Sequence, residues 1–157
     1  DDERIPHSFE IADAAGLSYS FGIANLTSAH PNSVVLEVKG KSGRTLEVQA
    51  CSLGGGRIMI NRLDGLDVNC TCEIPTLIVH NLDQPGHVAE VTSMLAHKSV
   101  NIANMSLYRD KRGGSAVMVV EMDQPLTKES LQWLEHLEGI VKVTYINVTE
   151  GEEDNVL

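Results

Sequence analysis

The order of strand and helix patterns in residues 74–149 constrains the fold more than any other feature of this chain. The order is strand IPTLIVHN, helix PGHVAEVTSMLAHK, strand VNIANMSLYRD, strand GGSAVMVVEMD, helix TKESLQWLEHLE and strand GIVKVTYINVT. The helical segments carry apolar residues at intervals of three or four, which places them on one stripe. Crossover helices that return right-handedly would both lie on one face of a four-stranded antiparallel sheet. The pattern therefore predicts an α+β fold with a ferredoxin-like βαββαβ domain over residues 73–150.

The first 72 residues carry a different pattern and predict a separate, small α/β domain. Residues 5–15 place Ile5, Phe9 and Ala12 on one face of a short helix. Four strand-like runs follow, LSYSFGI, SVVLEVKG, RTLEVQACSL and RIMINRL, and the turn signals AHPN, GKSG and GGG separate them. The apolar pattern then lapses, so we place the domain boundary near Cys72.

Charge and composition argue against several classes of partner. The chain has 12 Lys and Arg against 22 Asp and Glu, a formal net charge of −10, so it would repel a phosphate backbone or an anionic membrane surface. No apolar run approaches the roughly 18 residues of a membrane span, and no signal peptide opens the sequence. Three cysteines at no familiar disulfide spacing fit a reducing compartment. We expect a soluble, cytoplasmic protein that binds neither nucleic acid nor membrane, with a solvated acidic tail over residues 151–157.

The stretch HNLDQPGHVAEV, residues 80–91, joins a strand to a helix and has the chemistry of a small-ligand site. Pro85 suits the first helical position, where its missing N–H costs nothing. The amides of residues 86–88 would then point outward from the positive end of the helix, which is a seat for a carboxylate or phosphate. Asp83 adds a negative charge that an ammonium group would favour, so the two features together suit an amino acid. The alternative is that Asp83 and Gln84 only cap the helix.

This strand-to-helix corner also carries a resemblance to a known family. DQPGHVAEVTSMLAHKSVNIANMSL, with the strand, helix and strand after it, resembles the ACT domain, a regulatory module that binds small amino acids in many enzymes of amino-acid metabolism. The resemblance covers residues 74–148. Alignment on the PG pair with the serine-binding ACT domain of phosphoglycerate dehydrogenase implies ligand contacts at Asn81, Asp83 and Asn101. That family has a histidine and an asparagine where this chain has Asn81 and Asp83, whereas Asn101 matches. The candidate ligand-binding residues of this site are Asn81, Asp83, Gly86, His87 and Asn101.

The first half of the chain narrows the resemblance. DDERIPHSFEIADAAGLSYSF and AHPNSVVLEVKGKSGRTLEVQACSLGGGRIMI, followed by the ACT-like module, resemble the beta subunit of the bacterial iron–sulfur L-serine dehydratase. That family implies conversion of L-serine to pyruvate and ammonia at a [4Fe-4S] cluster in a separate alpha part. Such a cluster needs about four cysteine thiolates, and this chain has three. The resemblance therefore implies a regulatory, non-catalytic chain that binds no cofactor, works with a catalytic alpha subunit or domain, and senses an amino acid, most simply L-serine.

A second candidate site lies in the first domain. In the resembling family, residues 1–72 correspond to an allosteric substrate-binding domain, which makes His30, Asn32 and Arg57 candidates for binding a small anion. Arg57 could hold a carboxylate bidentately. The SLGGGRI run lacks the GxxxxGK[ST] spacing of a phosphate loop and leads into a strand, so a tight turn or bulge is its commoner meaning. For the HPN stretch, the alternative is an ordinary turn.

Other interpretations stay open. Cys70, Cys72, His80 and His87 could form a metal site, although CxC followed by two histidines seven residues apart fits no strong zinc pattern. The chain could also be the regulatory end of a D-3-phosphoglycerate dehydrogenase, or a stand-alone amino-acid-responsive interaction module.

The strand VNIANMSLYRD predicts self-association. It would form an edge of the ferredoxin-like sheet, and it carries neither a proline nor a charge before Arg109. An edge with so little protection invites pairing with another strand, and two ACT sheets joined side by side are common in the resembling family. We therefore expect a homodimer.

Overall fold

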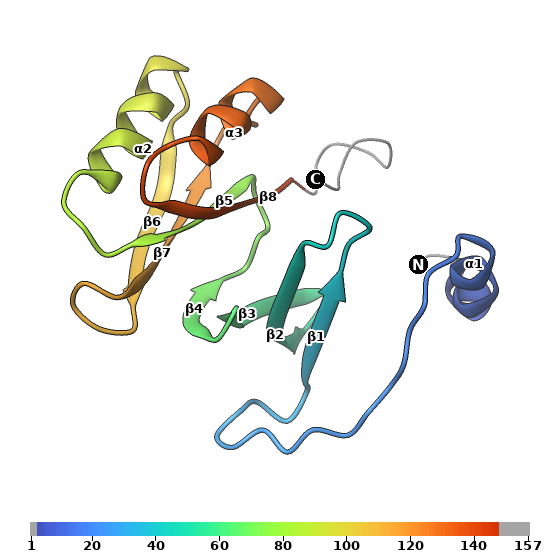
Figure 1. Cartoon of the computed structure of the whole chain (residues 1–157). Helices are drawn as coiled ribbons and strands as arrows, with labels where there is room; N and C mark the ends of the chain where they lie inside the picture. The colour runs from blue at the N-terminus through green and yellow to red at the C-terminus, as the bar shows by residue number, and fades with distance from the viewer. Residues whose placement is uncertain (1–2, 148–157) are drawn as a thin grey trace.

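The computed structural model describes residues 3–147 and contains two four-stranded antiparallel sheets (Figure 1). In the first sheet the strands follow chain order, whereas the second has the order β6-β7-β5-β8. The strands of the first sheet are β1 (Ser33–Lys39), β2 (Thr45–Gly54), β3 (Arg57–Leu63) and β4 (Leu66–Cys70). Those of the second are β5 (Thr76–Leu82), β6 (Ile102–Arg109), β7 (Ser115–Met122) and β8 (Ile140–Ile146). The acidic tail predicted at residues 151–157 lies outside the described residues.

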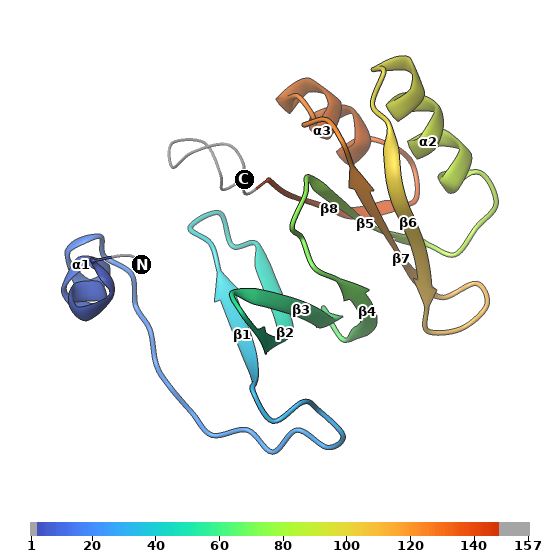
Figure 2. The same ribbon diagram turned by 180° about the vertical axis from the view of Figure 1, so that it is seen from behind.

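Two helices, α2 (His87–His97) and α3 (Lys128–Glu135), cover the same face of the second sheet (Figures 1 and 2). Between the helices and the sheet lies an apolar core in which Val91 and Leu95 of α2 and Leu134 of α3 are fully buried. The predicted α+β, ferredoxin-like fold is therefore confirmed. Val88, an apolar residue at helical spacing from Val91, is 41% exposed at the start of α2.

The opposite face of the second sheet packs against the first sheet. Ile78, Val117 and Val119 form a second core there, together with the first-sheet residues Ile60 and Leu63. Strands β5 and β7 are thus buried on both faces. A strand with two buried faces is apolar at successive positions and does not alternate, which explains the unbroken runs LIV and AVMVV.

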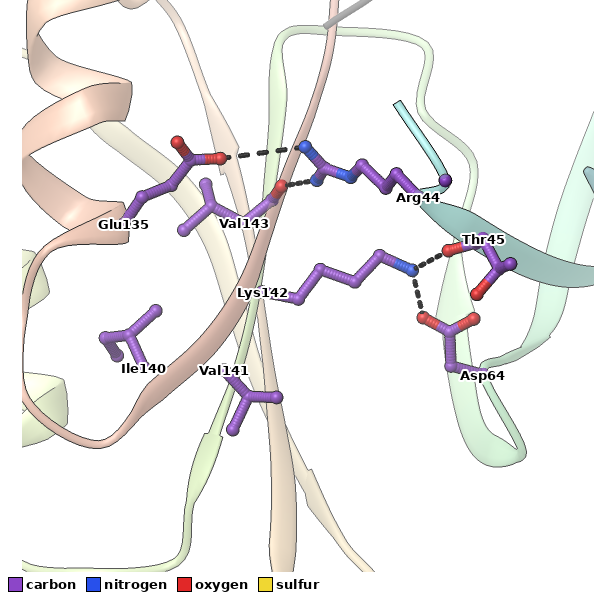
Figure 3. Close-up of a pocket in the computed structure, with 9 residues that line it drawn as sticks. Arg44, Thr45, Asp64, Glu135, Ile140, Val141, Lys142 and Val143 are labelled. Atoms are coloured by element: carbon purple, nitrogen blue, oxygen red, sulfur yellow. Dashed lines mark hydrogen bonds and ion pairs between the residues drawn. The ribbon is translucent and has the colours of Figure 1, made fainter. Parts of the chain in front are cut away.

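We call the interface between the two sheets the seam. Polar side chains lie at its edge (Figure 3). Arg44 donates to the carbonyl oxygen of Val143 on β8 and lies 3.6 Å from Oε1 of Glu135. Lys142, also on β8, donates to Oδ2 of Asp64. These residues line a cleft of about 650 Å³. The seam therefore combines an apolar core with charge pairs at its edge, so the two sheets are held by both.

The N-terminal region differs from its prediction. A 3₁₀ turn (Ile5–His7) leads into α1 (Ser8–Ala14), which buries none of its side chains and lies apart from both sheets (Figure 1). The run LSYSFGI, predicted as a strand, forms no regular secondary structure. Residues 17–23 have the alternation of a strand but no neighbouring strand to pair with within residues 3–147, and a strand is stable only within a sheet.

Two further elements depart from the expected boundaries. Strand β4 (Leu66–Cys70) lies in the segment where the apolar pattern of the sequence lapses. The pattern is weak there because only Val68 and Cys70 of the five strand residues are buried. Helix α2 begins at His87, so Pro85 precedes the helix and does not occupy its first position. None of the helices within residues 3–147 has the length and apolar content needed to cross a membrane.

Candidate functional site

The corner between β5 and α2 is built from residues 83–86, and two turns hold it. The amide of Leu82 donates to the carbonyl oxygen of Gly139 at 2.9 Å, in the turn between α3 and β8. The amide of Asp83 donates to the carbonyl oxygen of Gly114, also at 2.9 Å, in the turn between β6 and β7. The corner is therefore fixed on both sides by elements that follow it in the sequence.

The start of α2 is open to an anion. Gly86 is the N-cap residue with φ of 110°, and its carbonyl oxygen accepts the first helical hydrogen bond from the amide of Glu90. The amides of residues 87–89 have no acceptor in the part of the chain that the structure describes. A Cβ added at Gly86 would meet nothing within 4 Å, so the space outside the corner is free. The positive end of the helix and these amides can therefore receive a carboxylate.

Asp83 stands four residues before this seat, and its carboxylate is paired with Arg109. Its Oδ2 accepts hydrogen bonds from the amide of Gly113 at 2.9 Å and from Nη1 of Arg109 at 3.1 Å. The Gly113 amide, with the Arg109 guanidinium, holds the pKa of Asp83 below its ordinary value. No side chain caps the start of α2, so the alternative in which Asp83 or Gln84 caps that helix finds no support.

Asn81 and His87 are buried beneath the corner. Asn81 is 6% exposed, its Nδ2 donates to the carbonyl oxygen of Leu82 at 2.6 Å, and its Oδ1 has no donor among the described residues. The His87 ring lies against Gly139, where an added Cβ would approach its Nε2 and Cε1 to 2.5 Å. His87 therefore offers the corner its backbone amide, while its side chain packs into the turn before β8.

Asn101 lies at the other end of the sheet. Its Nδ2 donates to Oδ2 of Asp123 at 2.6 Å, just beyond β7. At this end of the sheet, Glu121 of β7 pairs with Thr76, the first residue of β5. The corner follows the last residue of β5, so it lies at the opposite end. At about 3.3 Å per residue, the length of β5 separates Asn101 from the corner by roughly 20 Å. One chain therefore does not bring Asn101 and Asp83 together.

The residues of the second candidate site lie at one end of the first sheet. The HPN stretch forms a turn in which the amide of Asn32 donates to Nδ1 of His30 at 3.2 Å. The carbonyl oxygen of Asn32 accepts from the amide of Ser52 at 3.0 Å, and Arg57 pairs with Gly54 at the β2–β3 hairpin. All three glycines of GGG have positive φ, as a tight turn requires.

The proposed metal ligands are not brought together. The Sγ atoms of Cys70 and Cys72 lie 3.6 Å apart in the seam core, where their hydrogen bond and burial raise the pKa of the Cys70 thiol. His80 faces the seam, whereas His87 lies on the helix-covered face. No group of three or more metal-ligating side chains occurs within residues 3–147.

Three residues that the sequence analysis did not single out shape the corner. Arg109 and Gly113 bind the Asp83 carboxylate, and Gly139 provides the surface on which His87 rests. The two glycines lie in the sequences DKRGG and LEGI, which predict turns. Such sequences do not predict which residues the turns contact. Arg109 carries no comparable signal, because 26 residues separate it from Asp83.

The chain is similar in sequence to known proteins. The model of the ACT domain family matches residues 75–135. The chain is similar to the probable L-serine dehydratase beta chain of Bacillus subtilis (strain 168), with 33% identity over 92% of this chain and 66% of that protein. It is 32% identical to the L-serine dehydratase beta chain of Peptoniphilus asaccharolyticus over 94% of this chain and 67% of that protein. It is also 31% identical to D-3-phosphoglycerate dehydrogenase of Archaeoglobus fulgidus, over 60% of this chain but 18% of the enzyme. The chain thus spans about two thirds of the length of the two beta chains.

Proposed function

The chain belongs to the family of L-serine dehydratase beta chains, and on that premise we propose that it is the regulatory part of an iron–sulfur L-serine dehydratase. The parent enzyme converts L-serine to pyruvate and ammonia, and a catalytic alpha subunit or domain carries its [4Fe-4S] cluster. The three cysteines of this chain do not fit such a cluster, because a cubane needs about four thiolates. The chain's own part is therefore to bind an amino acid and not to perform the reaction.

The open start of α2, four residues after the ionised Asp83, is the observation that carries this proposal. The carboxylate of an amino acid would accept hydrogen bonds from the amides of residues 87–89. Its ammonium group would approach Oδ1 of Asp83, because Oδ2 is already bound by Gly113 and Arg109. A phosphate would meet repulsion from the same carboxylate. An L-amino acid satisfies both charges, and L-serine is the simplest choice because it is the substrate of the parent enzyme.

Pairing of two copies along β6 would complete the site. β6 is an edge strand of the second sheet. If two β6 strands pair antiparallel about a twofold axis near Met105 and Ser106, Asn101 of a second copy lies beside Arg109. Arg109 in turn contacts Asp83. The 20 Å that separates Asn101 from its own corner would then be bridged by the dimer, and the bound amino acid would contact both copies.

Thermal unfolding in the presence of amino acids tests the proposal. L-serine at about 100 times its dissociation constant should stabilise the fold by about 2.7 kcal/mol per site, a shift of a few degrees in Tm. D-serine and pyruvate should give no shift, since they lack the handedness or the ammonium group. A panel of the common amino acids in which none shifts Tm would contradict the proposal.

Two variants assign the shift to the corner. Asn101→Ala should abolish the response to L-serine and lower the unliganded stability by no more than about 1 kcal/mol, because Asn101 is exposed and its side chain loses only the hydrogen bond to Asp123. Asp83→Ala should also abolish it, but should lower the unliganded stability by about 1–2 kcal/mol, because Gly113 and Arg109 lose their acceptor. A normal response in Asn101→Ala would argue against ligand binding between two copies.

A further inference from the structure

Residues 17–23 combine the sequence pattern of a strand with the exposure of an unpaired segment. Leu17, Tyr19, Phe21 and Ile23 alternate with Ser18, Ser20, Gly22 and Ala24. Such strict alternation indicates a strand with one face against a core. Yet Phe21 is 81% exposed and Ile23 is 105% exposed. The amides of residues 18–23 find no acceptor among the described residues.

Helix α1 already covers one side of this segment. The Phe9 ring stacks on Tyr19, with ring centroids 5.4 Å apart, and meets Phe21 edge-on at 5.9 Å. Tyr19 and Phe21 are themselves 6.0 Å apart. The chain turns back between helix and segment at Gly16, whose φ is 71°. Helix and segment therefore form one unit, residues 8–23, which is held by its own aromatic contacts.

The two beta chains are longer than the region that this chain matches. The chain spans 66% and 67% of the L-serine dehydratase beta chains of B. subtilis and P. asaccharolyticus, so about a third of each lies outside the matched region. Most of the large exposed apolar residues of the chain also lie before residue 60, and they include Val34, Leu36 and Val38 on the edge strand β1. Exposed apolar side chains in this number are typical of an interface.

We propose that residues 17–23 pair as a β-strand with the portion of a beta chain that lies outside the matched region. Backbone hydrogen bonds from that portion would satisfy the amides of residues 18–23, and its apolar side chains would cover Phe21 and Ile23. Helix α1 would then lie on one face of the completed sheet. This inference rests on membership of the beta-chain family and not on amino-acid binding, so either can fail without the other.

Hydrogen–deuterium exchange on two proteins tests the pairing. In this chain alone, the amides of residues 18–23 should exchange at close to unprotected rates. In the complete beta chain of B. subtilis, the segment aligned with residues 17–23 should be protected about 100-fold or more, and the matched region alone should lose that protection. Protection in this chain alone that rises with protein concentration would indicate pairing with a second copy and would overturn the proposal. Absence of protection in the complete B. subtilis chain would overturn it as well.

Substitutions in this chain test the exposed face independently. Phe21→Ser and Ile23→Ser should reduce the binding of an apolar dye such as ANS without lowering Tm, because neither side chain contacts the two sheets. Val141→Ser is the matched control, since Val141 is 70% exposed but lies on β8, and it should change dye binding little. A fall in Tm of Ile23→Ser as large as that of a core substitution would show that the segment packs within its own chain, against the proposal.

Discussion

Lys142 of β8 donates a hydrogen bond from Nζ to Oδ2 of Asp64 at 2.5 Å, across the seam between the two sheets (Figure 3). The same Nζ donates to the carbonyl oxygen of Thr45 at 2.7 Å. Oδ1 of Asp64 accepts from the amide of Glu47 at 2.9 Å. One carboxylate thus joins the β3–β4 turn, β2 and β8. Because β8 begins at Ile140, beside the corner, a single strand connects the proposed ligand site to the first domain.

Removal of the Lys142 charge should loosen the seam. Lys142→Met keeps most of the aliphatic stem and should reduce the free energy of unfolding by about 1–3 kcal/mol, because a partly buried carboxylate loses a charged donor. Chemical denaturation measures the loss, and a double-mutant cycle with Asp64→Ala should give a coupling energy above about 0.5 kcal/mol. Lys41→Met, at an exposed position, is the control and should be nearly neutral. Additive effects of the two seam substitutions would contradict the direct interaction.

His80 should make the stability of the fold depend on pH. Burial lowers the pKa of His80 below its ordinary value of 6.5, and Lys142 and Arg44 lower it further, against the opposing effect of Asp64, whose Oδ2 lies 3.6 Å from Nε2. The unfolded chain therefore binds a proton more readily than the folded one, so stability is lost as the pH falls below about 6.5. Unfolding measured between pH 7.5 and 5 should show this slope.

The variant His80→Gln isolates that contribution. It should flatten the slope between pH 7 and 5, whereas His97→Gln, which removes an exposed histidine at the end of α2, should retain it. Burial acts to raise the pKa of Asp64, but hydrogen bonds from Lys142 and from the Glu47 amide outweigh it and hold the value below 3.8. The stability that Asp64 supplies is therefore lost only at more acidic pH, outside this window. An unchanged slope in His80→Gln would assign it to another group.

The contact between Gly139 and His87 should make Gly139 intolerant of a side chain. Gly139→Ala forces a Cβ to within 2.5 Å of the imidazole, at a φ of 79°. Gly65→Ala introduces the same strain at φ of 81°, but with nothing within 4 Å of the new Cβ. The backbone strain costs about 1–2 kcal/mol in both, and the clash should add about 1–3 kcal/mol at position 139 only. Equal destabilisation of the two variants would show that the His87 ring moves freely.

A charge on the edge of the second sheet should weaken self-association. Leu107 is 56% exposed on β6, so Leu107→Lys should leave the fold intact and place two lysines near each other in a β6–β6 pair. Light scattering should give the mass of a dimer for the original chain and a shift toward monomer for the variant. Trp133→Lys, which changes a side chain 46% exposed on α3, should leave the mass unchanged. A monomeric mass for the original chain, with or without L-serine, would contradict the dimer.

The second sheet and its two helices were predictable because their signals are local. Periodicity of three to four residues in α2 and α3, and apolar runs in β5 and β7, come from contacts that each element makes with one core. The segment 17–23 shows where this reasoning fails. Its alternation is as regular as that of a true strand, but pairing requires a neighbour, and none occurs within the described residues. An alternating sequence pattern shows that a segment can form a strand. The segment forms one only where a neighbouring strand is present to pair with it.

The sequence by itself determined the order βαββαβ and the polar strand-to-helix corner within residues 80–91. Each follows from residue types and short spacings. Only the tertiary structure decided that Asp83 is bound by Arg109, that Lys142 reaches Asp64 across 78 residues, and that Asn101 stands at the far end of the sheet from the corner. The physical reason is that antiparallel register and the packing of two sheets set these distances, and both arise from contacts between segments far apart in the chain.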